Sequence, residues 1–302
     1  MGLDRLIAAV PRDLVLTLVD VGSAGGLHPR WRPFAPILSA VLFDPRESAP
    51  NGGFGAGQTR IYPVALGDQS GEATLHVTAL ANMSSFLEPD PKVFARYRKK
   101  AADTRIVESE LCPTERLDTL ANQDGFRPDV IKVDTQGSEL LVLTGAEKSL
   151  ESVVLAEIEV SFFQRYIGQP VFAEIEAWMK QRGFELLELY RLKRYRAANK
   201  LGQYKPMFDD GQQSGRVTYG DAIFIRDEKS ILAAAANDQG VSLLKAAIAL
   251  LAYGKTDHAA ALFDHGRHLL PPDTAAAFEA ALATKIRRNP IRHLSRLLKR
   301  SG

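Results

Sequence analysis

The sequence has very little cysteine and no long apolar run. Its single cysteine, Cys112, excludes an internal disulfide and any zinc site built from several cysteines. No stretch of about 18 or more residues is apolar throughout, so no segment is predicted to span a membrane. Charged residues, among them Asp4 and Arg12, interrupt the N-terminal stretch, which therefore lacks the apolar centre of a signal peptide. Together these absences predict a cytoplasmic protein.

A large net charge is missing as well. The 38 Lys and Arg residues and the 36 Asp and Glu residues leave a formal net charge of +2. Nucleic-acid binding usually needs a strongly basic domain or face, so we expect no nucleic-acid partner. What remains is the composition of an ordinary globular protein, 45% hydrophobic and 25% charged. A length of 302 residues is enough for about two domains.

Short apolar runs alternate with amphipathic stretches from residue 14 to about residue 227. This alternation predicts an α/β fold, in which helices cover a mostly parallel sheet. Strands are expected at residues 14–20, 40–44, 60–66, 130–134, 152–159, 184–189 and 221–226. Helices are expected at residues 90–101, 138–149 and 171–182.

The composition changes after Arg226. Residues 228–302 are rich in alanine, show no strand pattern and contain two helical segments joined by a turn at Gly254–Asp257. The chain ends in KIRRNPIRHLSRLLKR, which holds seven Lys or Arg residues and no acid. We therefore expect an α/β domain over residues 1–227 and a helical hairpin with a basic tail over 228–302. The tail is a candidate for contact with a membrane surface or a protein partner.

The first apolar run ends in an acid and a glycine-rich turn, VDVGSAGG. Asp20 closes the run, and Gly22 and Gly25 follow in the spacing D-x-G-x-x-G. Glycines at these positions let backbone N–H groups approach a ligand that a Cβ atom would obstruct. A tight turn without a ligand is the alternative interpretation.

A second acid, Asp44, follows the next apolar run in the segment LFDPRE. It lies 24 positions after Asp20 and is placed to accept hydrogen bonds from a ribose diol, although an Asp-Pro turn also explains it. Two carboxylates disfavour a pyrophosphate and attract a cationic amino-acid group. The pair therefore favours S-adenosylmethionine as the cofactor, with an NAD-dependent oxidoreductase or epimerase as the alternative.

A third acid, Asp134, ends the apolar run in PDVIKVDTQGSELL. Ligands of open α/β sheets bind outside the carboxyl ends of the strands, so Asp134 is expected on the same rim as the first two acids. Gln136 follows on the same turn and can donate to a substrate hydroxyl. Glu139 is a further candidate for substrate binding, but a carboxylate in a first helical turn also stabilises the helix dipole.

Two more acids, Glu157 and Glu159, close the apolar run in VVLAEIEVS. Their period-two spacing places both on one face of a strand. Asp134 and Glu159 are candidates to hold a divalent metal ion, and either can supply a general base. His28, which follows the glycine turn, is another candidate base, and a histidine at a helix N-terminus is the alternative. A rim of salt bridges explains the acids equally well.

A basic stretch with interleaved tyrosines, YRLKRYRAANK, occupies residues 190–200. A solvated loop is the simplest interpretation. If the stretch is functional, its charge suits an anionic saccharide or a lipid-linked sugar.

Seven motifs occur in the order and spacing of the FkbM family of S-adenosylmethionine-dependent methyltransferases, which this chain resembles over about residues 14–227. They are VDVGSAGG, LFDPRE, VALGDQSGEATLHV, ERLDTL, IKVDTQGSELLVLTGAE, EVSFFQRYIGQPVFAEI and YGDAIFIR. The D-T-Q-G-x-E-L-x-V-L-x-G-A run is the most specific of them. The resemblance implies a Rossmann-like, seven-stranded class I methyltransferase sheet whose last strand is antiparallel. It also implies O-methylation of a sugar, a polyketide or a related metabolite.

The resemblance also implies roles for particular residues. Those expected around the methionine part of the cofactor are Asp20, Gly22, Ser23 and Gly25. Asp44 falls at the ribose, Asp68 of ALGD near the adenine, and Asp134 beside the sulfonium and the acceptor. Many members read D-x-E-G where this chain has Gln136, so no role that needs a carboxylate there is expected. Residues 228–302 lie outside the resemblance, and a non-catalytic scaffold that recruits a partner through them is a further alternative.

Overall fold

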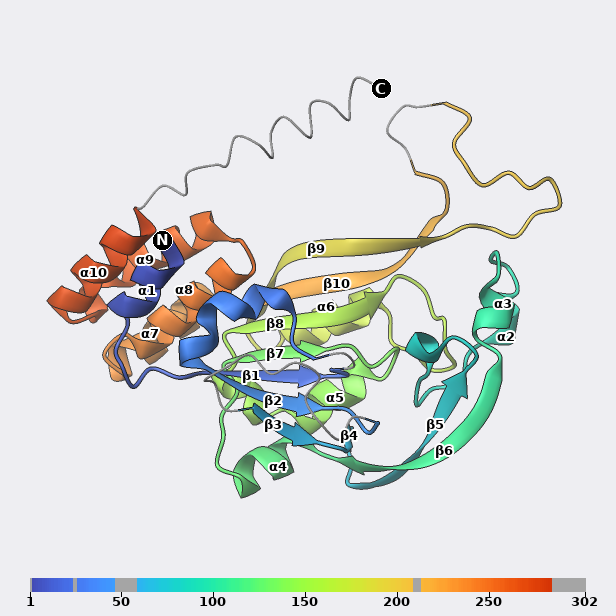
Figure 1. Cartoon of the computed structure of the whole chain (residues 1–302), viewed down its shortest axis with the longest axis horizontal. Coiled ribbons are helices and arrows are strands. Elements are labelled where there is room, and N and C mark those ends of the chain that lie inside the picture. Colours follow the sequence, from blue (N-terminus) through green and yellow to red (C-terminus); the bar gives the residue numbers. More distant parts are fainter. Residues whose placement is uncertain (1, 24–25, 47–58, 209–212, 284–302) are drawn as a thin grey trace.

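A seven-stranded sheet forms the centre of the computed structural model, which describes residues 2–23, 26–46, 59–208 and 213–283 (Figure 1). Its strands are β1 (Leu16–Val21), β2 (Leu38–Phe43), β3 (Thr59–Tyr62), β7 (Val130–Val133), β8 (Leu155–Ser161), β9 (Phe184–Tyr195) and β10 (Arg216–Arg226). They lie in the order β3-β2-β1-β7-β8-β10-β9, and β10 is antiparallel to both of its neighbours. The predicted α/β fold with an antiparallel last strand is confirmed.

The strand order reverses between β1 and β7. From β1 the chain moves outward to β2 and β3, and it later returns to the other side of β1, where β7 and β8 are added in parallel. Connections therefore leave the carboxyl ends of β1 and β7 in opposite directions. Such a reversal opens a crevice where open α/β sheets bind their ligands.

The prediction of a single strand over residues 60–66 is wrong. The structure divides it into β3, which ends at Tyr62, and β4 (Ala65–Leu66), which belongs to a second sheet. That sheet has the order β4-β6-β5, with β5 (Gly71–Thr78) antiparallel to β6 (Ile106–Glu115). Pro63 lies at the division, and a proline has no N–H group to continue the ladder of hydrogen bonds.

The helix expected over residues 90–101 is also divided. The structure has two short helices there, α2 (Pro91–Phe94) and α3 (Lys100–Asp103), and a 3-10 turn, η2 (Ala81–Met83), precedes them. Lys99 adopts a φ of 64°, a left-handed conformation that a continuous α-helix does not contain. The segment therefore changes direction before α3.

One face of the large sheet is covered by helices from the middle of the chain. These are α4 (Leu117–Gln123), α5 (Glu139–Gly145), η3 (Ser149–Ser152) and α6 (Phe172–Lys180). Their apolar side chains, such as Val142 and Ile175, form one buried core with alternate strand residues, such as Val19 and Ile131. The regular alternation of the strands assigns the intervening residues to the opposite face.

The opposite face is covered from both ends of the chain (Figure 1). The elements there are α1 (Gly2–Ala9), η1 (Pro29–Ile37), α7 (Glu228–Asn237), α8 (Val241–Ala252), α9 (Thr256–Gly266), η4 (Arg267–Leu269) and α10 (Pro272–Leu282). The expected helical hairpin is present as α8 and α9, with Gly254 at a φ of 74° in the turn between them. Leu244 and Ile248 of α8 share one core with Leu16 and Leu18 of β1.

The C-terminal helices also form polar contacts with the α/β part. Lys245 Nζ lies 2.9 Å from Asp129 Oδ1, and Lys255 Nζ lies 2.5 Å from Glu188 Oε2. The boundary at residues 227 and 228 stays a prediction. The basic stretch over residues 285–300 lies outside the described residues. Within the part of the chain that is described, no helix combines the length and apolarity needed to cross a bilayer.

Candidate functional site

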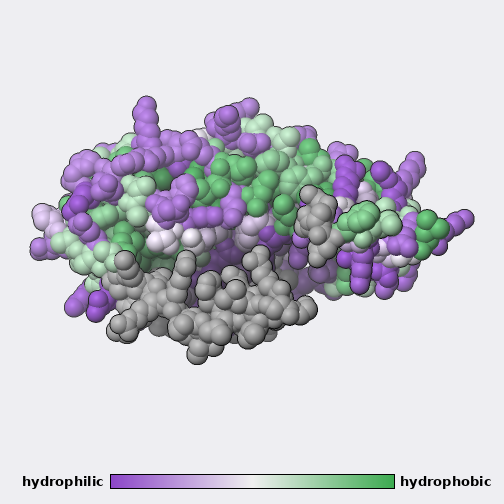
Figure 2. Space-filling model, turned by 90° about the horizontal axis from the view of Figure 1, so that it is seen from above, coloured by the Kyte–Doolittle hydropathy of each residue, from purple (hydrophilic) through white to green (hydrophobic). Residues whose placement is uncertain are grey.

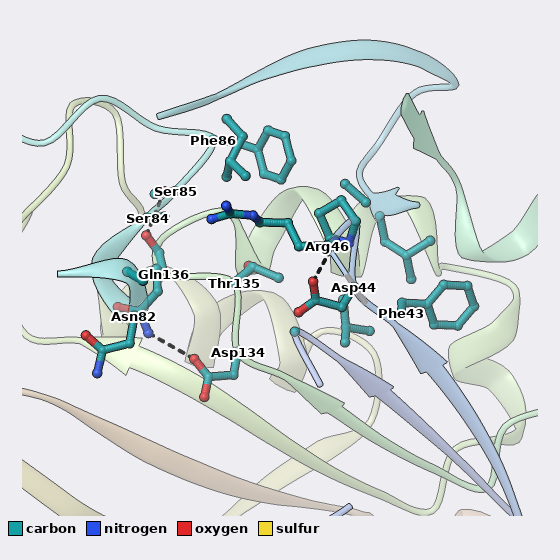
Figure 3. A pocket seen from close by; sticks show the side chains of 17 residues that line it. Phe43, Asp44, Arg46, Asn82, Ser84, Ser85, Phe86, Asp134, Thr135 and Gln136 are labelled. Carbon is teal, nitrogen blue, oxygen red and sulfur yellow. Dashed lines mark hydrogen bonds between the residues drawn. The ribbon is translucent and has the colours of Figure 1, made fainter. Parts of the chain in front are cut away.

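A cavity of about 550 Å³ lies at the carboxyl ends of β1, β2 and β7, where the strand order reverses. We call it the switch-point cavity. Asp44 and Asp134 lie on its strand side, and Phe86 and Arg46 lie across from Asp134 (Figure 3). The segment of residues 81–86, which follows β5, supplies much of the wall opposite the strands. Its volume is within the range of small-molecule sites.

Gly22 joins the ends of two neighbouring strands at the base of this cavity. Its φ is 77°, and a Cβ atom built on it would lie 2.0 Å from the carbonyl oxygen of Asp134. Any side chain at this position would therefore clash with backbone as well as strain the turn. The N–H of Gly22 donates to Phe43 O at 2.8 Å, and the N–H of Asp134 donates to Val21 O at 3.0 Å. These bonds hold the tips of β1, β2 and β7 together.

Asp44 follows the end of β2 and lines the switch-point cavity. Its Oδ1 accepts a hydrogen bond from the N–H of Arg46 at 2.9 Å, which closes a short turn and orients the carboxylate. The guanidinium of Arg46 also lines the cavity, and its Nη2 lies 3.5 Å from Glu110 Oε1. The one basic side chain in the lining is therefore partly balanced by a carboxylate of β6.

Gln136 links two acids at the other side of the cavity. Its side-chain Nε2 donates to Asp134 Oδ1 and to Glu159 Oε1, each at 3.0 Å. Its backbone carbonyl oxygen accepts a hydrogen bond from Ser85 Oγ at 2.9 Å. An amide supplies two N–H donors to the two carboxylates, whereas a glutamate would add a third carboxylate. This geometry gives a physical reason for glutamine at the position where many FkbM sequences have glutamate.

Glu159 itself is buried behind Gln136. Its Oε2 accepts from Arg165 Nη2 at 3.2 Å, and both side chains are almost inaccessible to solvent. Burial is the main cause that raises the pKa of Glu159 to about 8, the negative charge of Asp134 adds to it, and Arg165 opposes it. Arg165 also donates from Nε to Ser161 Oγ at 2.9 Å. The carboxyl group is thus paired with a buried arginine, carries its negative charge only above a pH of about 8, and does not line the cavity.

Asp20 is buried next to the cavity and does not line it. Its Oδ1 lies 3.2 Å from Lys132 Nζ, which also lies 3.8 Å from Asp134 Oδ2. Burial raises the pKa of Asp20 to about 6, although the charge of Lys132 acts in the opposite direction. Because Lys132 balances its charge, the electrostatic argument for a cationic ligand depends on Asp44 and Asp134.

His28 caps the 3-10 helix η1. Its Nδ1 accepts from the N–H of Arg30 at 3.2 Å and from Arg30 Nε at 3.1 Å. Burial lowers the pKa of His28, and the neighbouring Arg30 charge lowers it further. The ring lies outside the lining of the switch-point cavity, so this arrangement corresponds to the alternative of a histidine at a helix N-terminus.

Glu157 lies on the same face of β8 as Glu159 but in a different cluster. Its Oε2 accepts from Tyr253 Oη at 2.6 Å and lies 3.3 Å from Arg30 Nη1, and its Oε1 accepts from Tyr190 Oη. The guanidinium of Arg30 stacks over the Tyr253 ring at 4.2 Å. This cluster connects η1, β8, β9 and the end of α8. Both carboxylate oxygens of Glu157 already have partners within it.

The remaining predicted residues that the structure describes lie outside the lining of the cavity. Glu139 is buried, and its Oε1 accepts from the N–H groups of Thr135 at 3.1 Å and Gly137 at 2.9 Å, which holds the turn after β7. The carbonyl of Asp68 accepts from Arg116 Nη1 at 2.8 Å. Ser23 is buried, and its hydroxyl has no hydrogen-bond partner among the described residues. Gly25 lies outside the described residues.

The structure therefore brings four of the predicted site residues to one cavity: Gly22, Asp44, Asp134 and Gln136. Asp134 and Glu159, the predicted metal ligands, both accept from the Gln136 amide. Among the described residues no group of three or more His, Cys, Asp or Glu side chains is arranged to hold a metal ion.

Several residues of the site were not predicted from the sequence. Lys132 interrupts an apolar strand, and such a charge within a buried run is a signal for a charged partner nearby. Arg165 and the segment of residues 81–86 carry no comparable signal. They reach the site through a loop and a turn that have no periodic pattern.

The comparison with protein families supports a methyltransferase. The family model of the methyltransferase FkbM domain matches residues 43–186, which confirms the resemblance. None of the curated proteins compared with the chain matches it. One similar solved structure is a Streptococcus agalactiae protein of the NADB-Rossmann superfamily, with 12% identity, a TM-score of 0.34, and coverage of 93% of this chain and 96% of that one. Another is a Streptococcus pneumoniae protein described as a proposed tRNA (m1A22) methyltransferase, with 11% identity, a TM-score of 0.31, and coverage of 93% and 97%.

Proposed function

Since residues 43–186 form a methyltransferase FkbM domain, we propose that this methyltransferase transfers the methyl group of S-adenosylmethionine to a hydroxyl group of a saccharide or a related metabolite. The observation that carries the proposal is the switch-point cavity. Its strand side presents the carboxylates of Asp44 and Asp134, and Arg46, the one cation among the described lining residues, pairs with Glu110. This distribution of charge suits a cationic ligand without phosphate groups.

The lining fits the parts of S-adenosylmethionine. Asp44 stands where an acid after the second strand accepts hydrogen bonds from a ribose diol. Apolar side chains suited to a purine ring also line the cavity, namely Phe43, Leu66, Leu75 and Phe86. Asp134 offers a carboxylate for the cationic end of the cofactor. The absence of a side chain at Gly22 keeps the strand tips in contact below the ligand.

When bound, the cofactor supplies an electrophilic methyl group, and positioning of the acceptor oxygen then accounts for much of the catalysis. The acceptor hydroxyl must lose a proton, and Asp134 is the carboxylate on the cavity wall that is placed to receive it. Gln136 orients Asp134 through the hydrogen bond to Oδ1, and Glu159 with Arg165 orients Gln136. Glu159 thus acts as a positioning residue behind the base.

Titration calorimetry with S-adenosylmethionine and S-adenosylhomocysteine tests the cofactor assignment. We expect both to bind, and we expect Asp44→Asn to weaken binding at least about tenfold, which corresponds to the loss of a hydrogen bond to a charged acceptor. Asp13→Asn is the matched control, because Asp13 is exposed just before β1, at the opposite edge of the sheet. No binding at millimolar ligand, or equal affinities of the two variants, would contradict the proposal.

A further inference from the structure

A second cavity, of about 450 Å³, lies between the outer end of the β9–β10 ribbon and the short helix α3. We call it the basic cavity. Five cationic side chains line it: Arg98, Lys99, Lys100, Arg194 and Arg196. Asp103 is the one carboxylate among the described lining residues.

Backbone contacts hold the two sides of the basic cavity together. The N–H of Arg98 donates to Arg196 O at 2.9 Å, and Tyr97 forms an isolated antiparallel bridge with Ala197. Below them, the buried rings of Tyr97 and Tyr195 are in edge contact, with centroids 5.5 Å apart. Cations from two segments that are far apart in the sequence are therefore fixed around one space.

The positive charge in this space is largely uncompensated. Lys100 pairs with Asp103 at 2.9 Å, and no ion pair joins the other four cations to a described carboxylate. Two further acids of the sequence, Asp209 and Asp210, lie outside the described residues. Like charges at short range repel, and an anion with two or three negative charges balances four cations better than a single carboxylate does. Guanidinium groups, moreover, match phosphate oxygens in bidentate geometry.

One aromatic cluster connects the surroundings of the two cavities. It consists of Phe94, Tyr97, Tyr166 and Tyr195, with Met83 packed against them. Tyr195 lines the basic cavity. Tyr166 Oη donates to Met83 O at 2.9 Å, and the residues on either side of Met83, Asn82 and Ser84, line the switch-point cavity. This connection is why we consider one ligand for both cavities.

We propose that the basic cavity binds a phosphate or diphosphate group carried by the methyl acceptor. The link to an acceptor rests on the proposed function, whereas anion binding itself does not. The phosphate group can belong to a soluble sugar phosphate or to a lipid. Beside the cavity, the end of the molecule formed by residues 196–208 shows apolar residues among hydrophilic ones, and three apolar side chains there are strongly exposed: Leu201, Met207 and Phe208 (Figure 2). The test therefore includes a separate measurement of binding to lipid vesicles.

Calorimetric titration of the full chain with pyrophosphate tests the anion site directly. We expect binding at low salt that weakens as salt is added, because four of the five cations are exposed and salt screens their charges. The double variant Arg98→Gln, Arg196→Gln should lose at least about tenfold in affinity, since each charge contributes to the attraction. Arg127→Gln, an exposed arginine at the opposite edge of the sheet just before β7, should change it less than about twofold. No binding of pyrophosphate, or equal losses in both variants, would overturn the site.

A vesicle arm separates the two sources of phosphate. Binding to vesicles that contain phosphatidic acid, but not to phosphatidylcholine vesicles, together with its loss in the double variant, assigns the site to a lipid-borne phosphate. Pyrophosphate binding without vesicle binding assigns it to a soluble phosphorylated acceptor. Pyrophosphate binding without S-adenosylhomocysteine binding would overturn the proposed function and leave the anion site. The reverse result would overturn the anion site alone.

Discussion

The carboxyl edge of the sheet has two halves that look alike in the sequence and differ in the structure. At β2 and β7, Asp44 and Asp134 follow apolar strands and line an open cavity. At β8, Glu157 and Glu159 also close an apolar strand, but Arg30 and Tyr253 bind Glu157, and Arg165 binds Glu159. An acid at a strand tip is therefore a ligand group in one half and part of a buried cluster in the other.

The difference comes from what reaches each half of the edge. Arg30 belongs to η1, which follows β1 in the chain. Arg165 lies in the loop after β8, and Tyr253 lies at the end of α8. Buried carboxylates require such partners, because a charge without one is costly in a low-dielectric interior. In the other half, Lys132 pairs closely with the buried Asp20 and lies farther from Asp134, at 3.8 Å, so Asp44 and Asp134 still line the cavity.

The largest expected effect comes from breaking the buried pair. Arg165→Met leaves Glu159 buried without its cation, so we expect the free energy of unfolding to fall by about 3–5 kcal/mol in denaturant titrations at pH 8.5. Arg267→Met removes the cation of an exposed pair with Glu279 and should cost about 0–1 kcal/mol. Similar losses in both variants would show that the buried pair of Arg165 and Glu159 contributes no more to stability than an exposed pair does.

Adding charge to the junction of the two halves is expected to have the next largest effect. Gln136→Glu replaces the amide between Asp134 and Glu159 by a third carboxylate, so it should destabilise the fold by about 2–3 kcal/mol at pH 8.5. The loss should shrink at pH 5.5, where protonated carboxyls can donate again. Gln181→Glu, at an exposed position after α6, is the control and should change little at either pH. A loss that does not depend on pH would contradict the prediction.

The pH dependence of stability should carry the signature of Glu159. The native state keeps its proton up to a pKa of about 8, whereas the unfolded chain loses it near the ordinary value of 4.5. The native state thus binds more protons in this window, so its stability falls as pH rises, by up to about 1.4 kcal/mol per pH unit. Glu159→Gln should flatten unfolding measured from pH 5 to pH 8, and Glu185→Gln, at an exposed position of β9, should not. An unchanged slope in Glu159→Gln would contradict the prediction, because the slope would then come from other groups.

The smallest effect is expected at the contact between α8 and β8. Tyr253→Phe removes the hydroxyl that donates to Glu157 but leaves the Arg30 and Tyr190 contacts, so we expect a loss of about 1 kcal/mol in thermal unfolding. Tyr204→Phe removes a hydroxyl bonded to a loop carbonyl and should stay within about 0.5 kcal/mol. Equal shifts would mean that Tyr253 contributes no more than a loop contact.

Local patterns predicted most of the sheet. The strands β1, β2, β7 and β8 are predominantly apolar because both of their faces are buried, and that pattern is visible without any tertiary information. Asp44 and Asp134 were predicted as rim residues because each follows the end of such an apolar strand directly. The division at Pro63 and the left-handed Lys99 were missed, because a general periodicity does not register a single backbone exception.

By itself, the sequence determined most strands of the large sheet, the glycine turn after β1 and the resemblance to the FkbM family, since each depends on residues close together in the chain or on a series of short motifs. Only the tertiary structure decided which acids face a ligand and which are neutralised, because the pairing of Glu159 with Arg165, of Asp20 with Lys132 and of Glu157 with Arg30 depends on packing between separate elements. The same packing collected the cations of the basic cavity. The interaction between two charges depends on their separation in space, and a sequence pattern does not give that separation for residues far apart in the chain.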